Sequence, residues 1–218
     1  RSMLQDKKRQ VKISNEMIKN IIFDFGGVLV VKGKLNIIKQ TISKLIFKEG
    51  NLRESNIREK IKDSWDLWKI GKISEKEFFQ GAKEKLNLKH PIFILKKQLY
   101  SAHKPEKGLF LLIKKLKQSY KIYLLSNHAR EWYNAQNKKL KLEKLFDGIL
   151  TSFQAKIAKP DMKIYKLLLE KFKLKPKECL FIDDQKENLI PARKLGIKTI
   201  HYLNPAQLKE ELKKHGII

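Results

Sequence analysis

The feature that most constrains the fold is a set of short apolar segments, each bounded by polar or turn residues. Four such segments are evident: Ile21–Phe23, Ile122–Leu125, Leu180–Ile182 and Ile197–Tyr202. Short apolar runs of this kind are typical of strands that are buried on both faces, as occurs in parallel sheets. The pattern therefore predicts a parallel sheet with helices covering both of its faces.

Helical periodicity occupies the stretches between these segments. Apolar residues recur at helical spacing in Leu109–Leu116, Arg130–Leu142, Met162–Phe172, Leu189–Leu195 and Pro205–Lys214. Gly196 follows one of them, at a place where a helix commonly ends. An alternation of strands and helices predicts an α/β fold, a Rossmann-like doubly wound parallel sheet.

Residues 34–103 break this alternation and contain no convincing strand. The stretch instead shows four helical periods, Leu35–Phe47, Ile57–Ile70, Glu75–Leu88 and Ile92–Ala102. We expect an all-helical insertion, with Trp65 and Trp68 in its apolar core. The expected organisation is a basic N-terminal tail over residues 1–19, an α/β core over residues 20–33 and 104–218, and a helical cap over residues 34–103.

Polar residues of a particular kind follow three of the predicted strands: Asp24, then Ser126 and Asn127, then Asp183 and Asp184. The carboxyl ends of parallel strands meet at one edge of the sheet, where open α/β sheets bind their ligands. Carboxylates that lie close together repel one another unless a cation joins them. Oxygen ligands without His or Cys favour Mg²⁺, which also accepts phosphate oxygens. The sequence therefore predicts a magnesium site that receives a phosphorylated substrate.

Further residues near these strand ends favour a bound phosphate. The backbone N–H groups of Gly26 and Gly27 can approach an anion closely because neither residue carries a side chain. Ser126 and Asn127 can donate hydrogen bonds to a phosphate oxygen, and Lys159 adds a positive charge. An aspartate in such a pocket can attack phosphorus and form an acyl phosphate.

Four motifs carry a family resemblance: Ile21–Leu29 (IIFDFGGVL), Leu125–Asn127 (LSN), Ala158–Asp161 (AKPD) and Phe181–Asp184 (FIDD). In this order they resemble the motifs of the haloacid dehalogenase-like hydrolase superfamily. The helical insertion resembles the cap that some members carry after the first motif, and Trp65–Phe79 is similar to cap sequences of that subgroup. The resemblance implies a Mg²⁺-dependent phosphatase that acts on a small phosphorylated metabolite through an aspartyl-phosphate intermediate.

The resemblance also implies a role for each matching residue. Asp24 would be the nucleophile, Ser126 would bind the transferring phosphate, and Lys159 would neutralise both. The implied metal ligands are Asp24, the backbone carbonyl of Gly26, Asp183 and Asp184. Asn188 stands where many relatives carry another acidic residue, and this difference would weaken the metal site slightly.

One departure from the family pattern bears on the reaction. Most phosphatases of this superfamily carry a second Asp two residues after the nucleophile, where it protonates the leaving oxygen, whereas this chain has Gly26. A general acid typically contributes about 10²–10⁴ in rate. Its loss predicts a preference for leaving groups that are already stable, as in the sugar-1-phosphate phosphatase-like members with a similar first motif. Two alternatives remain open, namely a catalytically weak binding protein and a 2-haloacid dehalogenase, which works without metal.

Composition limits the remaining possibilities. The 218 residues are 42% hydrophobic, which is enough for a packed core, and carry a net charge of +26. Lysine is spread evenly along the chain, so we expect nucleic acid to bind only through general positive charge. We expect no membrane span and, because Cys179 is the one cysteine, a reducing, cytoplasmic location. Cys179 is predicted to be buried. His128 follows Ser126 and Asn127 and could touch the substrate, but a single His in a loop more often faces solvent, which is what we expect here.

Overall fold

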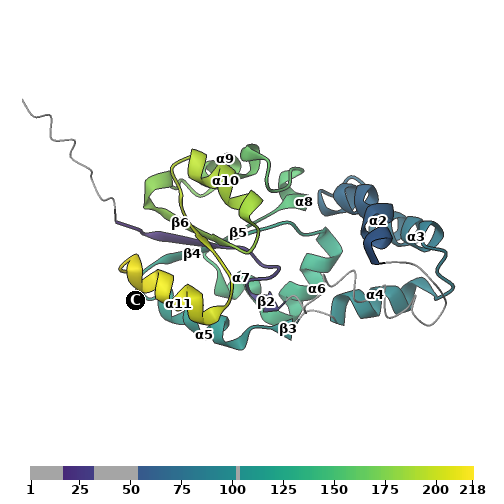
Figure 1. Cartoon of the computed structure of the whole chain (residues 1–218), viewed down its shortest axis with the longest axis horizontal. Helices are drawn as coiled ribbons and strands as arrows, with labels where there is room; N and C mark the ends of the chain where they lie inside the picture. Colours follow the sequence, from purple (N-terminus) through teal and green to yellow (C-terminus); the bar gives the residue numbers. More distant parts are fainter. Residues whose placement is uncertain (1–16, 32–53, 102–103) are drawn as a thin grey trace, which may run out of the picture.

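The computed structural model describes residues 17–31, 54–101 and 104–218. A five-stranded parallel sheet with the order β5-β4-β1-β6-β7 lies at its centre (Figure 1). β1 is the middle strand, because it pairs with β4 on one side and with β6 on the other. The strands are β1 (Asn20–Phe23), β4 (Lys121–Ser126), β5 (Gly148–Thr151), β6 (Cys179–Asp183) and β7 (Lys198–His201). The predicted doubly wound α/β fold is confirmed.

Helices cover both faces of the sheet. Successive residues of a strand point to opposite faces, and β1 illustrates the consequence. Ile21 and Phe23 pack with the apolar residues of α5 and α11, whereas Ile22 packs with those of α9 and α10. The helices of the core are α5 (Lys107–Leu116), α6 (Arg130–Leu140), α7 (Leu142–Leu145), α8 (Ser152–Ala155), α9 (Met162–Lys171), α10 (Lys186–Lys194) and α11 (Pro205–Lys214).

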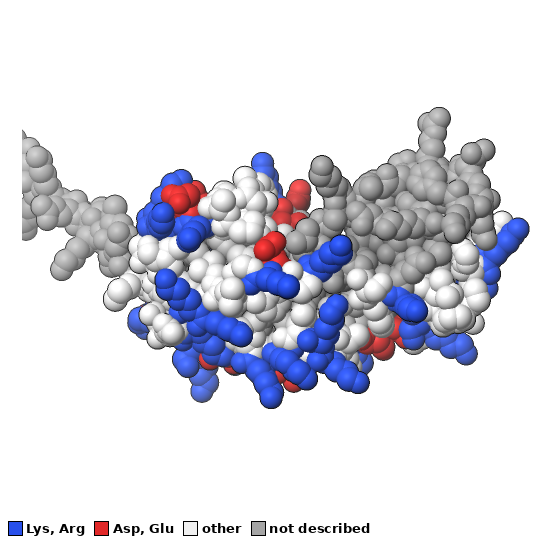
Figure 2. All heavy atoms as spheres, turned by 90° about the horizontal axis from the view of Figure 1, so that it is seen from below, with Lys and Arg blue, Asp and Glu red and all other residues white. Residues whose placement is uncertain are grey.

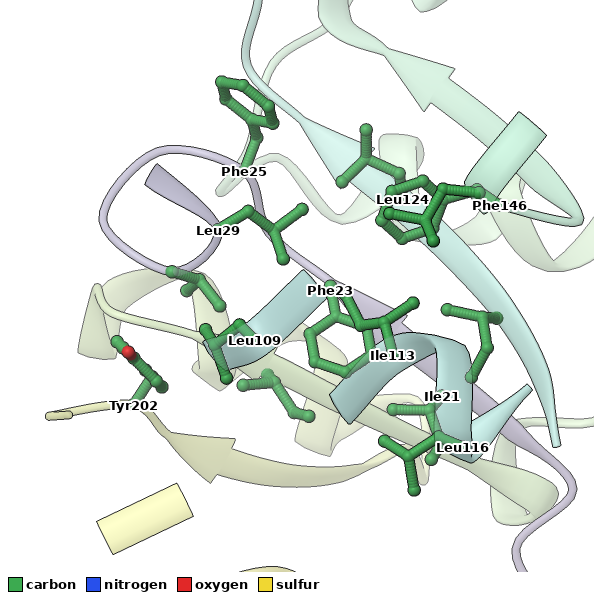
Figure 3. Packing of buried hydrophobic residues seen from close by; sticks show 14 of the residues in the cluster. Ile21, Phe23, Phe25, Leu29, Leu109, Ile113, Leu116, Leu124, Phe146 and Tyr202 are labelled. Atoms are coloured by element: carbon green, nitrogen blue, oxygen red, sulfur yellow. The ribbon is translucent and has the colours of Figure 1, made fainter. Parts of the chain in front are cut away.

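Close packing beneath β1 fixes the position of the strand. Phe23 lies among the side chains of Leu109 and Ile113 of α5 (Figure 3), and Phe23 and Ile113 are fully buried. Burial of one such side chain stabilises the fold by about 1.5–3 kcal/mol. The residue that follows β1 therefore leaves a rigid strand at a defined point of the sheet edge.

β5 and the end of α6 differ from the expectations. β5 was not expected, because its sequence GILT contains a glycine and only two apolar residues; it is an edge strand that pairs with β4 alone. The helix expected over Arg130–Leu142 ends at Leu140, because Lys141 adopts a left-handed conformation (φ 56°) and separates α6 from α7.

Three described helices occupy the segment expected as a helical cap: α2 (Glu54–Lys69), α3 (Glu75–Lys85) and α4 (Ile92–Ser101). They have an apolar cluster of their own, which includes Trp68, Phe78 and Leu95 and which Trp132 of α6 joins from the core. Trp68 is buried and Trp65 half-buried, as expected. The helix expected over Leu35–Phe47 lies outside the described residues.

A short antiparallel ribbon lies where the chain leaves the core and where it returns. β2 (Val30–Val31) pairs with β3 (Lys104–Pro105), although residues 32–103 separate the two in sequence. Glu106, which follows β3, donates its backbone N–H to the carbonyl of Leu29 at 2.9 Å. This ribbon ties the loop after β1 to the start of α5.

Charge is spread over the surface of the core. Figure 2 shows Lys and Arg side chains distributed across the face seen from below, with acidic side chains among them. The arrangement agrees with the even spread of lysine in the sequence. Among the described residues, no helix combines the length and the apolar character that a membrane crossing requires.

Candidate active site

The site begins at the ends of three neighbouring strands. The register pairs Phe23 of β1 with Leu124 of β4 and with Ile182 of β6. Asp24 therefore lies level with Asp183, the last residue of β6, and with the residue before Ser126 at the end of β4. Its backbone N–H donates to the carbonyl of Ile182 at 2.9 Å. Adjacent strands lie about 4.8 Å apart. The predicted convergence of strand-end residues at one sheet edge is thus a consequence of strand order and register.

Lys159 joins two of the carboxylates. Its Nζ lies 2.7 Å from Oδ1 of Asp24 and 2.6 Å from Oδ2 of Asp183, and all three side chains are buried. Burial opposes the charge on Lys159, but the carboxylates of Asp183 and Asp24 more than offset this cost and raise its pKa above the ordinary value. Lys159 therefore stays positively charged between the two aspartates.

The side chain of Asn127 holds Lys159 in place. Its Oδ1 accepts a hydrogen bond from the backbone N–H of Lys159 at 2.8 Å, and its Nδ2 donates to the carbonyl of the same residue at 2.9 Å. This two-point clamp uses one of the two N–H bonds of the amide. Asn127 therefore positions Lys159, and its contact with substrate stays a prediction.

Asp183 has a nearly complete set of hydrogen bonds within the protein. Its Oδ1 accepts from the backbone N–H of Gln185 at 2.8 Å, and Nδ2 of Asn188 lies 3.0 Å from both of its oxygens. The salt bridge to Lys159 adds a third partner. Asn188 is in turn held by the hydroxyl of Tyr165, which donates to its carbonyl at 2.7 Å. Asn188 therefore fixes Asp183, and Asp183 chiefly orients Lys159.

Asp184 completes a cluster that could hold a cation. One oxygen each of Asp24, Asp183 and Asp184 lies within 4.8 Å of the others, and Asp184 is the least buried of these residues. Three carboxylates and one ammonium group leave two net negative charges, which one divalent cation balances. The donors are all oxygen, which suits Mg²⁺. Each of the three aspartates offers one carboxylate oxygen to such an ion.

The two glycines after Asp24 play different parts. Gly27 has a φ of 91°, which side chains rarely allow, and its N–H donates to the carbonyl of Val30 at 3.0 Å. Its N–H is therefore used within its own turn, and a contact with an anion stays a prediction for this residue. Gly26 does not have a positive φ, and within the described part of the chain its N–H donates no hydrogen bond.

Ser126 and His128 form a buried pair that sequence reasoning missed. Ser126, the last residue of β4, is 2% exposed, and its Oγ lies 3.0 Å from Nδ1 of His128. The expectation that His128 faces solvent is wrong, since the residue is 3% exposed. Its ring packs edge-on against Phe25 and tilted against Trp132, with centroid distances of 4.8 and 5.1 Å. Trp132 and Tyr133 follow within five residues, but the contacts with Phe25 and Ser152 depend on segments that only the fold brings together.

Contacts from the cap reach the same region. The hydroxyl of Ser152 accepts the backbone N–H of His128 at 2.9 Å and donates to the carbonyl of Lys69, the last residue of α2, at 2.6 Å. Nε1 of Trp68 donates to Oε2 of Glu131 at 3.2 Å. The end of α2 is therefore docked on α6 and α8 beside the Ser126–His128 pair.

A doubly wound sheet with a buried Asp–Lys–Asp group at its carboxyl edge and a helical cap defines the class. The chain belongs to the haloacid dehalogenase-like hydrolase family, whose model matches residues 21–202. The earlier resemblance is thereby confirmed at the level of the family.

Two phosphatases and one solved structure are similar to this chain over most of its length. A sesquiterpene phosphatase from Aspergillus oryzae is 25% identical over 90% of this chain and 95% of its own length. A D-ribitol-5-phosphate phosphatase from Bacteroides thetaiotaomicron is 28% identical over 90% of this chain and 97% of its own. Among solved structures, a HAD family enzyme from Bacteroides thetaiotaomicron in complex with magnesium and inorganic phosphate matches with a TM-score of 0.72 and 28% identity, covering 88% of this chain and 98% of that chain.

Proposed function

We propose that the protein is a Mg²⁺-dependent phosphatase that hydrolyses a small phosphorylated metabolite through an aspartyl-phosphate at Asp24. The observation that carries the proposal is the buried Asp24–Lys159–Asp183 group with Asp184 beside it, whose carboxylate oxygens lie close enough together to hold one divalent cation. Support also comes from relatives of nearly full length that are phosphatases, and from a relative that binds magnesium and phosphate together.

The chemistry divides among residues at the strand ends. The carboxylate of Asp24 attacks phosphorus, the bond from phosphorus to the leaving oxygen breaks, and that oxygen takes up a proton from solvent water. Water then attacks the same phosphorus and gives up a proton to solvent, and the bond from phosphorus to the oxygen of Asp24 breaks, which releases inorganic phosphate and restores the carboxylate. Lys159 reduces the repulsion between the attacking carboxylate and the phosphate. A bound Mg²⁺ would supply further charge neutralisation and a ligand position for a phosphate oxygen.

The phosphate needs hydrogen-bond donors as well as charge. The hydroxyl of Ser126 lies at the end of the strand next to Asp24, and the N–H of Gly26 has no acceptor among the described residues. We assign these two donors to the phosphate oxygens. Gly26 offers no side chain to protonate the leaving oxygen, so the proposal includes a preference for substrates with stable leaving groups, such as aryl, acyl and anomeric sugar phosphates.

Phosphate release from a panel of esters tests the proposal. We expect Mg²⁺-dependent release from p-nitrophenyl phosphate, acetyl phosphate and glucose 1-phosphate, and much slower release from glycerol 3-phosphate. Asp24→Asn should abolish turnover, whereas Asp63→Asn, which alters an exposed aspartate of α2, should leave it unchanged.

Each alternative gives a different outcome in the same assay. Release of halide from 2-haloacids without Mg²⁺ would indicate a dehalogenase. Binding of phosphate without turnover of any ester would indicate a binding protein. Faster hydrolysis of glycerol 3-phosphate than of the aryl ester at equal binding would contradict the leaving-group argument.

A further inference from the structure

Contacts on several sides fix the backbone and the ring of His128. Its backbone N–H is bound by Ser152, and its ring packs between Phe25, Trp132 and Tyr133 at centroid distances of 4.8, 5.1 and 6.2 Å. These contacts come from the loop after β1 and from α6. They leave the ring few alternative orientations, so its Nδ1 is presented to Ser126 as a fixed hydrogen-bonding group.

The contact between Oγ of Ser126 and Nδ1 of His128 can be made with either residue as the donor. A hydroxyl has a single hydrogen. If Ser126 donates it to Nδ1 of His128, none remains for a phosphate oxygen. If Nδ1 of His128 carries a proton and donates it to Oγ, the hydrogen of Ser126 is free to point at the anion. A phosphate that binds beside Ser126 therefore favours the second arrangement, in which the imidazole directs the hydroxyl.

We propose that His128 is a positioning residue for phosphate binding: its Nδ1–H donates to Oγ of Ser126 and thereby turns the hydroxyl hydrogen toward a phosphate oxygen of the substrate. The inference rests on the proposed phosphatase function and adds to it a specific source of phosphate affinity. His128 acts through Ser126 and does not itself touch the phosphate.

The shapes of the amino acids allow a matched set of variants. In His, Cγ is bonded to Nδ1 and Cδ2. The oxygen and nitrogen of the Asn amide, and the two methyl groups of Leu, lie at these same two positions. His128→Asn keeps a donor at that position, whereas His128→Leu has the same shape and no donor. Both remove the rest of the ring, so both should lower the melting temperature by similar amounts. His128→Gln carries an amide one bond further out, at the position of Nε2.

The probe is inorganic phosphate, titrated by calorimetry into the full-length chain with saturating Mg²⁺. We expect His128→Asn to bind phosphate within about threefold of the unaltered chain, and His128→Leu and His128→Gln to bind about tenfold more weakly, as befits one lost hydrogen bond. If the Leu variant does not fold, the Asn and Gln variants still give the comparison. Equal affinities across the folded variants would overturn the inference.

A double-mutant cycle separates positioning from a general packing role. In Ser126→Ala the hydroxyl is gone, so His128 has nothing left to direct, and His128→Leu should weaken phosphate binding no further in that background. Additive losses would show that His128 acts by packing alone and would refute the proposal.

The same measurements distinguish this inference from the proposed function. If the unaltered chain with Mg²⁺ binds no inorganic phosphate, the phosphatase proposal fails and the inference falls with it. If the chain binds phosphate and His128→Leu binds it equally well, only the inference about His128 fails.

Discussion

Replacement of Lys159 by Met should destabilise the protein more than most single changes, and divalent metal should partly reverse the effect. The ammonium group bridges Asp24 and Asp183, and the three side chains are 1%, 7% and 0% exposed. Methionine has a similar length and no charge, so the variant leaves two buried carboxylates without their shared partner. Removal of one member of a buried ion pair costs about 3–5 kcal/mol, because the remaining charge is left uncompensated.

Urea or thermal unfolding in EDTA measures this cost. For a domain of this size 1 kcal/mol corresponds to roughly 2–4 °C, so the melting temperature should fall by about 6–20 °C. Lys163→Met, which alters an exposed lysine at the start of α9, is the matched control and should cost less than about 0.5 kcal/mol. Mg²⁺ should stabilise Lys159→Met more than the unaltered chain, because a third net negative charge accompanies the loss of the ammonium.

Two results would refute this reasoning. One is a loss of less than about 1 kcal/mol in EDTA, which is the range of an exposed ion pair. The other is an equal effect of Mg²⁺ on Lys159→Met and on the unaltered chain, since the cation and the ammonium would then not share the same carboxylates. Asp183→Asn in the Lys159→Met background removes one of the two carboxylate charges that have lost their partner, and it should recover part of the lost stability.

Three further predictions concern the same region. The pKa of Lys159 is raised from its ordinary 10.5, so the contribution of its charge to stability should be fully present below pH 10.5 and be lost only as the pH rises through the higher folded-state pKa. The difference in unfolding free energy between the unaltered chain and Lys159→Met should therefore be constant from pH 7 to 10. A difference that disappears below pH 9 would contradict the raised pKa. Gly26→Asp should raise turnover of glycerol 3-phosphate by about 10²-fold or more and that of acetyl phosphate far less, because a general acid helps poor leaving groups most; equal gains would argue against a missing acid. Ser152→Ala removes the hydroxyl that links His128 to Lys69 and should cost about 1–3 kcal/mol in chemical unfolding, while an unchanged midpoint would mean that the contact carries no stability.

The central strands and the carboxylates could be predicted from sequence because both depend on local patterns. Apolar segments indicate buried strands, and parallel strands bring their carboxyl ends to one edge of the sheet. The location of Asp24 and Asp183 at the same edge could therefore be predicted from their places after the strands. β5 escaped because an edge strand is covered less completely and needs fewer apolar residues, as the half-buried Gly148 and Ile149 show.

Positions that depend on distant partners were beyond the sequence. His128 looks like a polar loop residue until Phe25, from the loop after β1, is seen against its ring. Asn127 was expected at the phosphate, whereas its amide clamps Lys159, a contact across 32 residues of chain. In both cases the residue type indicated a polar role, but the sequence did not indicate the partner. Hydrogen bonds between loops depend on the packed fold rather than on spacing along the chain.

Capture of a phosphate mimic on Asp24 tests the central claim most directly. Fluoroberyllate adds to carboxylates that accept phosphoryl groups, and ¹⁹F NMR of the full chain with Mg²⁺ reports the adduct. The account predicts bound fluoride resonances that require Mg²⁺, that vanish in Asp24→Asn and that persist in Asp63→Asn. Resonances that survive in Asp24→Asn, or that form equally well in EDTA, would contradict the proposal that Asp24 receives the phosphoryl group beside a divalent cation.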